Sequence, residues 1–212
     1  NTGLEKFDLL INDACLMSGI EHYAAMARYF DFALGSPEIT LNPSFDMELM
    51  TNVLNDNPNI DIGQLGKLMV DKYMQDMGAL APDTVPVLGA VITDLRGFDG
   101  VVNALDNFTE VVTANPAAYV SEIGQVRANT YAYSFFLPED QFGPATNIDI
   151  GDFMLRVARS TTDTQLSSAA QGVLNSLSQV RLYSNAGTQL ARFSTFYNIY
   201  FPARSYEFDT RY

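Results

Sequence analysis

The residues best suited to chemistry stand near the start of this sequence, in the string FDLLINDACLM at positions 7–17. An apolar run ends there in Asp13, Ala14 and Cys15, and Cys15 is the only cysteine among 212 residues. A thiol at such a place can act as a nucleophile if it ionises, which usually requires a neighbouring base. The only histidine is His22. The sequence therefore raises two questions: whether the thiol is displayed, and which group is its base.

Cys15 follows a predicted buried strand over residues 7–12, where the apolar residues show no helical period. Open α/β sheets bind their ligands beyond the carboxyl ends of the strands, so this position favours a displayed thiol. The alternative is an inert core cysteine, which is the usual role of a lone cysteine. Asp13 argues against that alternative, because burying an unpaired carboxylate is costly.

Asp13 stands two positions before the thiol, and in an extended segment the two side chains lie on the same face. This carboxylate cannot activate Cys15, because a nearby negative charge raises the pKa of a thiol. It suits instead a pocket for a cationic substrate side chain, which it would hold by a charge-assisted hydrogen bond.

His22 lies seven residues after Cys15, inside a helix predicted for residues 20–30. That helix has to leave the edge of the sheet, which carries the imidazole away from the thiol. We therefore interpret His22 as a structural or surface histidine, and the base is not identified from the residues alone.

Length and composition limit the possible classes of protein. A chain of 212 residues can form one large domain, and its formal charge of −13 disfavours binding to nucleic acid. One cysteine excludes an internal disulfide framework and a cysteine-based zinc site, and we predict no metal ligands and no required cofactor. No apolar run reaches the roughly 18 residues of a membrane span. The first residue is Asn1 rather than Met, so we expect a processed or trimmed chain.

Predicted strands and helices alternate along the chain without a Gly/Ser linker, which is typical of a single layered α/β domain. Strands are predicted over residues 7–12, 32–34, 85–94, 131–137, 180–184 and 196–201. Helices are predicted over residues 20–30, 45–54, 61–77, 98–113, 117–127, 152–160 and 164–179. The string NIDIG occurs twice, before the helices at 61–77 and 152–160, and we interpret the copies as independent helix starts. The first copy lacks the glycine and glutamate of a calcium loop.

FDLLINDACLM resembles the nucleophile segment of the clostripain family of cysteine peptidases, within the wider group of caspases, legumains and gingipains. The shared pattern is an apolar strand, an acidic residue, a small residue and the catalytic cysteine. Glu21 stands where the family usually has glutamate. Ser36 stands where the family has the serine of a Ser-Glu-Glu string, although here the string is Ser36-Pro37-Glu38. NPSFD at residues 42–46 replaces a Gly-Trp-Pro-Tyr-type segment without its tryptophan.

Three later strings extend the resemblance over the whole chain. VLGAVITDLRGFDGVVNAL, at residues 87–105, resembles the family's strand-then-helix segment. NIDIGDFMLRVARS, at residues 147–160, resembles its Tyr-x-Asp-Leu-Gly-Asp-Phe segment. YNIYFPARSYEFDTRY, at residues 197–212, resembles its closing strand with an Ile-Tyr-Phe-Pro string. The resemblance implies a caspase-like layered α/β fold with a central, mostly parallel sheet flanked by helices.

The resemblance also implies an activity: a secreted or cell-surface bacterial cysteine endopeptidase that cleaves after Arg or Lys through a Cys-His dyad and an acyl-enzyme. Cys15 would be the nucleophile, with its backbone N–H in the oxyanion hole, while Asp13 and Ser36 would line the specificity pocket. In that family the catalytic histidine precedes the cysteine, and the zymogen is cut between them. Residues 1–212 would then be a heavy chain, completed by a light chain that carries the histidine. Calcium dependence occurs in part of the family.

Two alternatives stay open at this point. The chain could be a non-catalytic α/β binding module with a structural Cys15 and an acidic surface that docks basic partners. It could also be a degenerate peptidase with the same fold and no histidine near Cys15. The reactivity of the thiol in the folded state distinguishes a displayed cysteine from a core cysteine.

Overall fold

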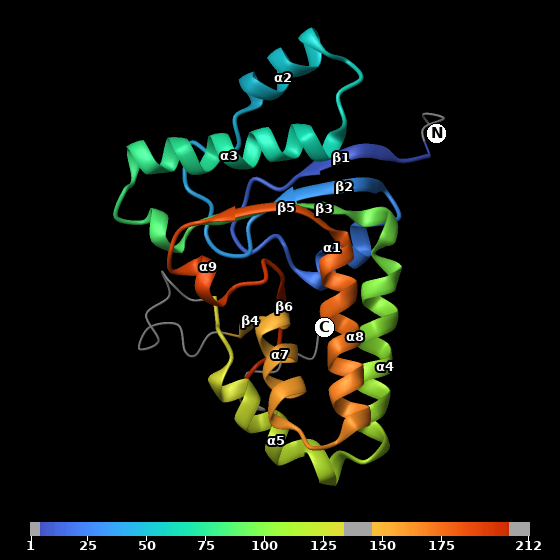
Figure 1. Cartoon of the computed structure of the whole chain (residues 1–212). Coiled ribbons are helices and arrows are strands. Elements are labelled where there is room, and N and C mark those ends of the chain that lie inside the picture. The colour runs from blue at the N-terminus through green and yellow to red at the C-terminus, as the bar shows by residue number, and fades with distance from the viewer. Residues whose placement is uncertain (1–4, 134–145, 204–212) are drawn as a thin grey trace.

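In the computed structural model, which describes residues 5–133 and 146–203, four strands form a central sheet in the order β1-β2-β3-β5 (Figure 1). Their bounds are Phe7–Ile11 for β1, Phe30–Gly35 for β2, Gly89–Asp94 for β3 and Arg181–Ala186 for β5. β1 and β2 are parallel, whereas β3 is antiparallel to both β2 and β5. Three of the four strands therefore point the same way, and the sheet is mixed.

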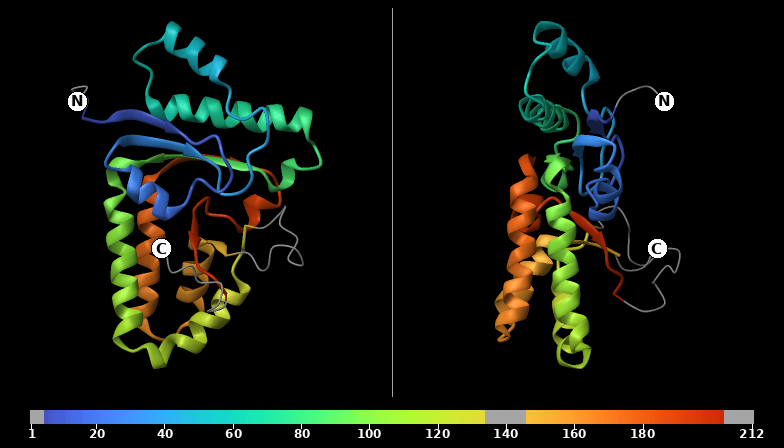
Figure 2. Two further views of the ribbon diagram at one scale, coloured as in Figure 1. Left: turned by 180° about the vertical axis from the view of Figure 1, so that it is seen from behind. Right: turned by 90° about the vertical axis from the view of Figure 1, so that its right-hand side faces the viewer.

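Helices cover both faces of this sheet (Figure 2). One face carries α2, Met47–Asp56, and α3, Ile62–Leu80. The other carries α1, Ile20–Met26, with α4, Asp99–Ala114, and α8, Thr164–Val180. Beyond these lie α5, Pro116–Asn129, and α7, Ile150–Ser160. A short helix, α9, spans Leu190–Phe193.

The residues of β2 and β3 alternate between two hydrophobic cores, as successive strand residues must. Ala33 and Val91 point into the core formed with α1, α4, α7 and α8. Leu34 and Ile92 point into the core formed with α3. Both strands are buried on both faces, so the sheet edge that carries β1 rests on a rigid centre.

β1 is more exposed than the sequence predicted. Residues 7–12 were expected to form a buried strand, but Phe7 is 56 % exposed, residues 8–11 are exposed or half-buried, and only Asn12 is buried. The reason is position: β1 is an outer strand of the sheet and pairs, within the described residues, only with β2. An apolar composition does not distinguish a central strand from an edge strand.

The segment predicted as a strand over residues 196–201 does not join the central sheet. β6, Asn198–Tyr200, pairs antiparallel with β4, Asn147–Asp149, in a separate two-stranded sheet. The predicted helix over 20–30 also ends early, since Phe30 already begins β2. The predicted strand over 85–94 starts with a 3₁₀ turn at Val85–Val87.

Both NIDIG strings begin helices, as predicted. Asp61 caps α3 by accepting the N–H of Gln64 at 3.0 Å, and Asp149 caps α7 by accepting that of Asp152 at 2.7 Å.

Ala132 forms one bridge to Ile148, while residues 134–137 of the predicted strand at 131–137 lie outside the described residues. So do Asn1 and the part of the last family string after residue 203. No helix in the described part of the chain combines the length and the apolarity of a membrane span.

Candidate active site

The predicted nucleophile lies on a turn that follows β1. Asn12 continues the ladder with β2 by donating its N–H to Leu34 O at 2.9 Å, and the chain then turns through Ala14, Cys15 and Leu16. Leu16 has φ 61°, in the left-handed region that costs a non-glycine residue about 1 kcal/mol. The alternation expected for Asp13 and Cys15 therefore does not apply, because this segment is not extended.

The thiol of Cys15 is exposed, so the alternative of a core cysteine is wrong for the described chain. Thr40, in the loop after β2, faces it. The N–H of Thr40 donates to Cys15 Sγ at 3.3 Å, and the Thr40 hydroxyl donates to Ala14 O at 3.1 Å. The thiol also donates to Thr40 O, which lies 3.9 Å from Sγ. The parallel pairing of β1 and β2 brings their carboxyl ends, and thus these two loops, together.

Asp13 is exposed and forms no ion pair with the described residues. It stands two positions before Cys15, and both residues are exposed on the segment that follows β1. That the carboxylate and the thiol line one pocket stays a prediction.

His22 makes a structural contact. Its Nε2 lies 2.9 Å from Asn12 Oδ1, and Asn12 Nδ2 donates to Leu34 O at 3.3 Å. Since the amide nitrogen faces a carbonyl, the amide oxygen faces the imidazole, so Nε2 of His22 carries the hydrogen and donates it. Burial lowers the pKa of His22. This geometry supports the structural interpretation of His22, and no second imidazole exists in the sequence.

Ser36, predicted to line the specificity pocket, is fully buried. Its Oγ accepts the N–H of Glu38 at 3.2 Å and lies 3.3 Å from the carbonyls of Glu38 and Ile39. Glu38 O in turn accepts the N–H of Leu16 at 2.8 Å. Ser36 therefore shapes the loop that contacts the Cys15 turn, and its hydroxyl does not face solvent.

Two residues at this site were not identified from the sequence: Thr40 and Asn198. Asn198, at the start of β6, is 3 % exposed and donates from Nδ2 to Leu16 O at 2.9 Å. A polar residue inside the aromatic string FYNIYF was a usable signal for Asn198, because buried amides need partners. Thr40 carried no comparable signal, since its contact depends on the pairing of two loops.

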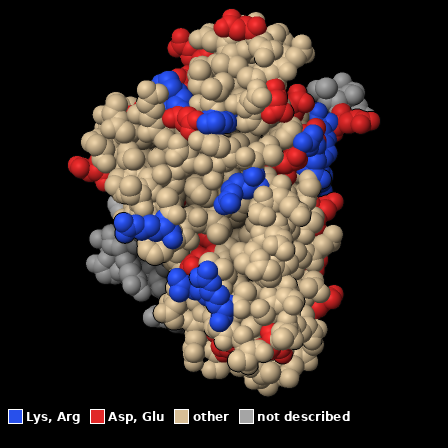
Figure 3. Space-filling view, viewed as in Figure 1, with Lys and Arg blue, Asp and Glu red and all other residues tan. Residues whose placement is uncertain are grey.

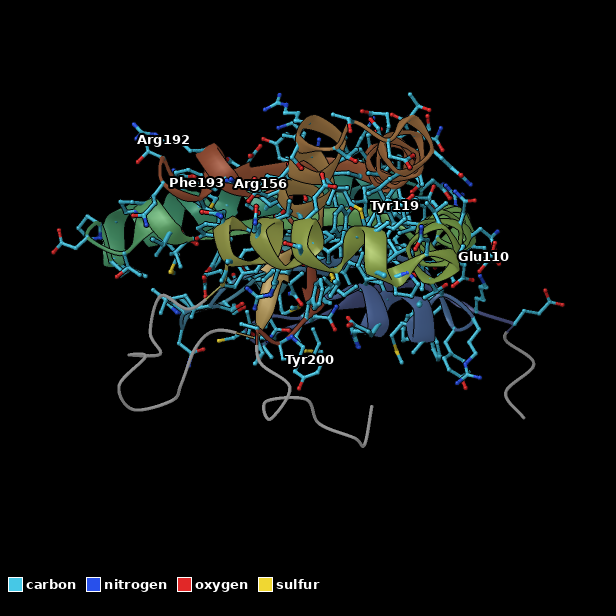
Figure 4. The ribbon with its side chains drawn as sticks, turned by 90° about the horizontal axis from the view of Figure 1, so that it is seen from below. Glu110, Tyr119, Arg156, Arg192, Phe193 and Tyr200 are labelled. Carbon is cyan, nitrogen blue, oxygen red and sulfur yellow. The ribbon has the colours of Figure 1, made fainter. Side chains whose placement is uncertain are left out.

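One pocket of the described structure lies apart from this site. A pocket of about 530 Å³ lies between α5 and α7, with Arg156 and Arg159 on its wall, and no residue of the Cys15 turn lines it. Figure 4 shows Arg156 and Arg192 on one side of the molecule and Tyr200, in the same strand β6 as Asn198, on the opposite side. We therefore assign the candidate site from the hydrogen bonds around Cys15 rather than from a cavity.

The surface charges are dispersed. On the face shown in Figure 3, acidic side chains are scattered over the surface and basic ones lie in separate groups. Among the described residues, no three His, Cys, Asp or Glu side chains lie together as metal ligands.

A model of the clostripain family matches residues 2–208. The chain belongs to the clostripain family. The predicted family is thus confirmed, and with it the enzyme class, a cysteine peptidase. No curated protein matches the sequence of this clostripain-family chain.

Solved structures of the family share its fold. A clostripain from Bacteroides thetaiotaomicron, in complex with a peptide inhibitor, is 14 % identical with a TM-score of 0.61, over 92 % of this chain and 78 % of its own. An inactive zymogen of a C11 protease from Parabacteroides distasonis is 16 % identical with a TM-score of 0.63, over 93 % and 53 %. A secreted C11 cysteine protease from Bacteroides thetaiotaomicron is 13 % identical with a TM-score of 0.57, over 92 % and 50 %. The layered α/β fold is therefore confirmed, and this clostripain-family chain spans about half the length of the last two.

Proposed function

We propose that this chain is the cysteine-bearing part of an endopeptidase that cleaves polypeptides after Arg or Lys, with Cys15 as its nucleophile. The observation that carries the proposal is the exposed thiol at the carboxyl end of β1, in contact with the N–H of Thr40, in a member of a cysteine peptidase family. A ligand crevice at this edge of the sheet is the usual arrangement in α/β proteins.

The proposed reaction proceeds through an acyl-enzyme. Cys15 Sγ attacks the carbonyl carbon of the scissile bond, the amine leaves with a proton supplied by a histidine, and water then hydrolyses the thioester. The backbone N–H of Cys15 donates to no acceptor among the described residues, which suits a donor of the oxyanion hole. One such donor typically contributes about 3 kcal/mol to the transition state.

The base of this reaction has to come from outside residues 1–212, because His22 uses Nε2 for Asn12. The outer edge of β1 has no partner strand within the described residues, and an unpaired edge can accept a further strand. We propose that a preceding strand, on a light chain cut from the same precursor, pairs there and carries the histidine. The inactive zymogen among the similar structures supports maturation by processing.

The proposed preference for Arg or Lys rests on Asp13, an exposed carboxylate two positions before Cys15 without an ion-pair partner in the described chain. The inhibitor bound to the Bacteroides thetaiotaomicron clostripain contains the peptide VLTK, which ends in lysine and supports this preference. Ser36 would contribute through the shape of the 36–40 loop. We also propose export from the cell, since one similar structure is a secreted protease. Calcium dependence stays an expectation from the family.

The test is the reactivity and activity of Cys15 in the complete protein. We expect iodoacetamide to alkylate Cys15 in the folded state and to abolish hydrolysis of fluorogenic Arg and Lys amides. The variant Cys15→Ala should have no measurable hydrolysis and an unchanged melting temperature, because the thiol is exposed. Alkylation without any hydrolysis by the wild type would favour a degenerate peptidase. Hydrolysis by Cys15→Ala near the wild-type rate would remove Cys15 from the mechanism.

A further inference from the structure

The turn that carries Cys15 is held from the far end of the chain by Asn198. This side chain donates from Nδ2 to Leu16 O at 2.9 Å and to Pro37 O at 3.4 Å. Its backbone N–H donates to Ser18 O at 3.1 Å. One buried amide therefore joins the loop after β1 to the loop after β2, and it lies 182 residues beyond Leu16.

The contact with Leu16 matters because Leu16 follows Cys15 directly and has a positive φ. Both backbone polar groups of Leu16 are held: its N–H by Glu38 O at 2.8 Å, and its carbonyl by Asn198. A left-handed conformation at a leucine is costly and persists only when its surroundings fix it. These two hydrogen bonds are what fixes it here, and the direction of the Cys15 thiol and N–H depends on the same turn.

Asn198 is itself fixed. β6 pairs with β4, Tyr200 N–H donates to Glu21 Oε1 at 2.9 Å, and the Ser18 hydroxyl donates to Phe196 O at 2.8 Å. A Cβ on Gly19 would lie 3.1 Å from Asn198 Oδ1, so the amide is packed closely from this side as well. Because the pairing of β6 with β4 fixes the position of the Asn198 amide, this amide can fix the position of the loop that it contacts.

We propose that Asn198 is a positioning residue for Cys15: it keeps Leu16 in the left-handed conformation that aims the thiol and the N–H of Cys15 at the substrate. The proposal rests on the proposed peptidase function and adds to it a residue distant in sequence. A displacement of a catalytic group by about 1 Å is enough to reduce turnover by roughly 100-fold. Asn198 therefore acts on turnover rather than on substrate affinity.

The decisive variant is Asn198→Asp in the complete, matured protein. Aspartate has the same shape, but it carries at most one O–H hydrogen where asparagine has two N–H hydrogens, so it cannot donate to Leu16 O and Pro37 O together. We expect kcat for Arg and Lys amides to fall by roughly 100-fold, with KM unchanged within about 3-fold. We also expect the pH midpoint of Cys15 alkylation by iodoacetamide to rise, because a loosened turn weakens the Thr40 N–H contact to sulfur.

A second variant tests the same contact with a smaller change. Gly19→Ala places a methyl group against Asn198 Oδ1, while Gly19 has φ −78°, which alanine adopts without strain. We expect changes in kcat and in the alkylation midpoint in the same direction as for Asn198→Asp, but smaller. If Asn198→Asp does not fold, the result for Gly19→Ala decides whether Asn198 positions Cys15.

The matched control is Tyr183→Phe, on the side of the sheet covered by α3. It removes the 2.6 Å hydrogen bond from Tyr183 to Asp71 and destabilises the fold without contact to the Cys15 turn. It should lower the melting temperature and leave kcat and the alkylation midpoint unchanged. Wild-type kcat and midpoint in both Asn198→Asp and Gly19→Ala would overturn the proposal. If the wild type hydrolyses nothing, the proposed function fails, and the alkylation midpoint still decides the role of Asn198.

Discussion

At the scale of single residues, Cys15 has one hydrogen-bond donor to its sulfur, the N–H of Thr40, and an exposed carboxylate, Asp13, two positions earlier. Thiolates of low pKa usually stand beside a cation. An imidazolium from the proposed light chain would supply that charge, and Asp13 would then be free to bind the substrate.

We predict that Asp13→Asn impairs the hydrolysis of Arg and Lys amides much more than it impairs the alkylation of the Cys15 thiol. The kcat/KM should fall roughly 100-fold, because the cationic substrate side chain would lose its charged partner. Iodoacetamide alkylation of Cys15 should proceed at an unchanged or higher rate, since a negative charge is removed. The two rates are measured on the same preparation, and equal losses in both would contradict a role in specificity.

The protonation of His22 should reduce stability at acidic pH. Burial lowers the pKa of His22 below 6.5, so near pH 6 the unfolded chain binds a proton that the folded chain does not. The contribution of a neutral His22 is therefore present above about pH 6.5 and is lost as the pH falls through that value. We predict that the melting temperature falls less between pH 7 and pH 5 in His22→Gln than in the wild type. Parallel pH profiles for the two proteins would refute this role.

At the scale of elements, the string NIDIG caps two helices in different surroundings. Both NIDIG copies cap a helix, but Asp61 is exposed whereas Asp149 is fully buried. Asp149 also accepts the Tyr133 hydroxyl at 2.6 Å and the Thr195 N–H at 2.6 Å. Burial raises the pKa of Asp149, and these donors oppose the rise. Asp149 thus ties the start of α7 to the segment that leads into β6 and Asn198.

We predict that Asp149→Ala destabilises the fold by about 3 kcal/mol or more, because it leaves buried donors without an acceptor. Asp61→Ala, its matched control, removes the same type of cap at an exposed site and should cost about 1 kcal/mol. Urea unfolding of the two variants and the wild type gives both numbers. Similar losses in the free energy of unfolding for the two variants would show that the buried cap at Asp149 stabilises the fold no more than the exposed cap at Asp61.

At the scale of the whole molecule, the described sheet has a tightly packed centre and one open side. β2 and β3 are buried between two helical layers, whereas β1 exposes Phe7 at the outer edge. Exposed apolar edge strands pair readily with other chains. The net charge of −13 disfavours association with anionic polymers.

We predict that residues 1–212 produced alone are inactive and self-associate through the edge of β1. Size-exclusion chromatography and the hydrolysis of Arg and Lys amides measure both properties. Co-production with the segment that precedes residue 1 in the precursor should restore a defined complex and activity. A soluble, monomeric and active isolated chain would overturn the two-chain proposal.

The sequence alone determined the features that depend on near neighbours. The helix starts at Asp61 and Asp149, the alternation of strands and helices, and the family strings around Cys15 are all local, because caps and periodicity involve residues a few positions apart. These features were sufficient for the α/β class and for the family, and they are the basis for proposing Cys15 as the nucleophile.

Only the tertiary structure decided what surrounds that nucleophile. Thr40 and Asn198 reach the Cys15 turn from positions 25 and 182 residues away from their partners, Cys15 and Leu16. The edge position of β1 and the separate pairing of β6 with β4 are likewise set by which strands meet. Hydrogen bonds between distant segments exist only after strand pairing has brought them together, and the composition of a strand does not specify its partner.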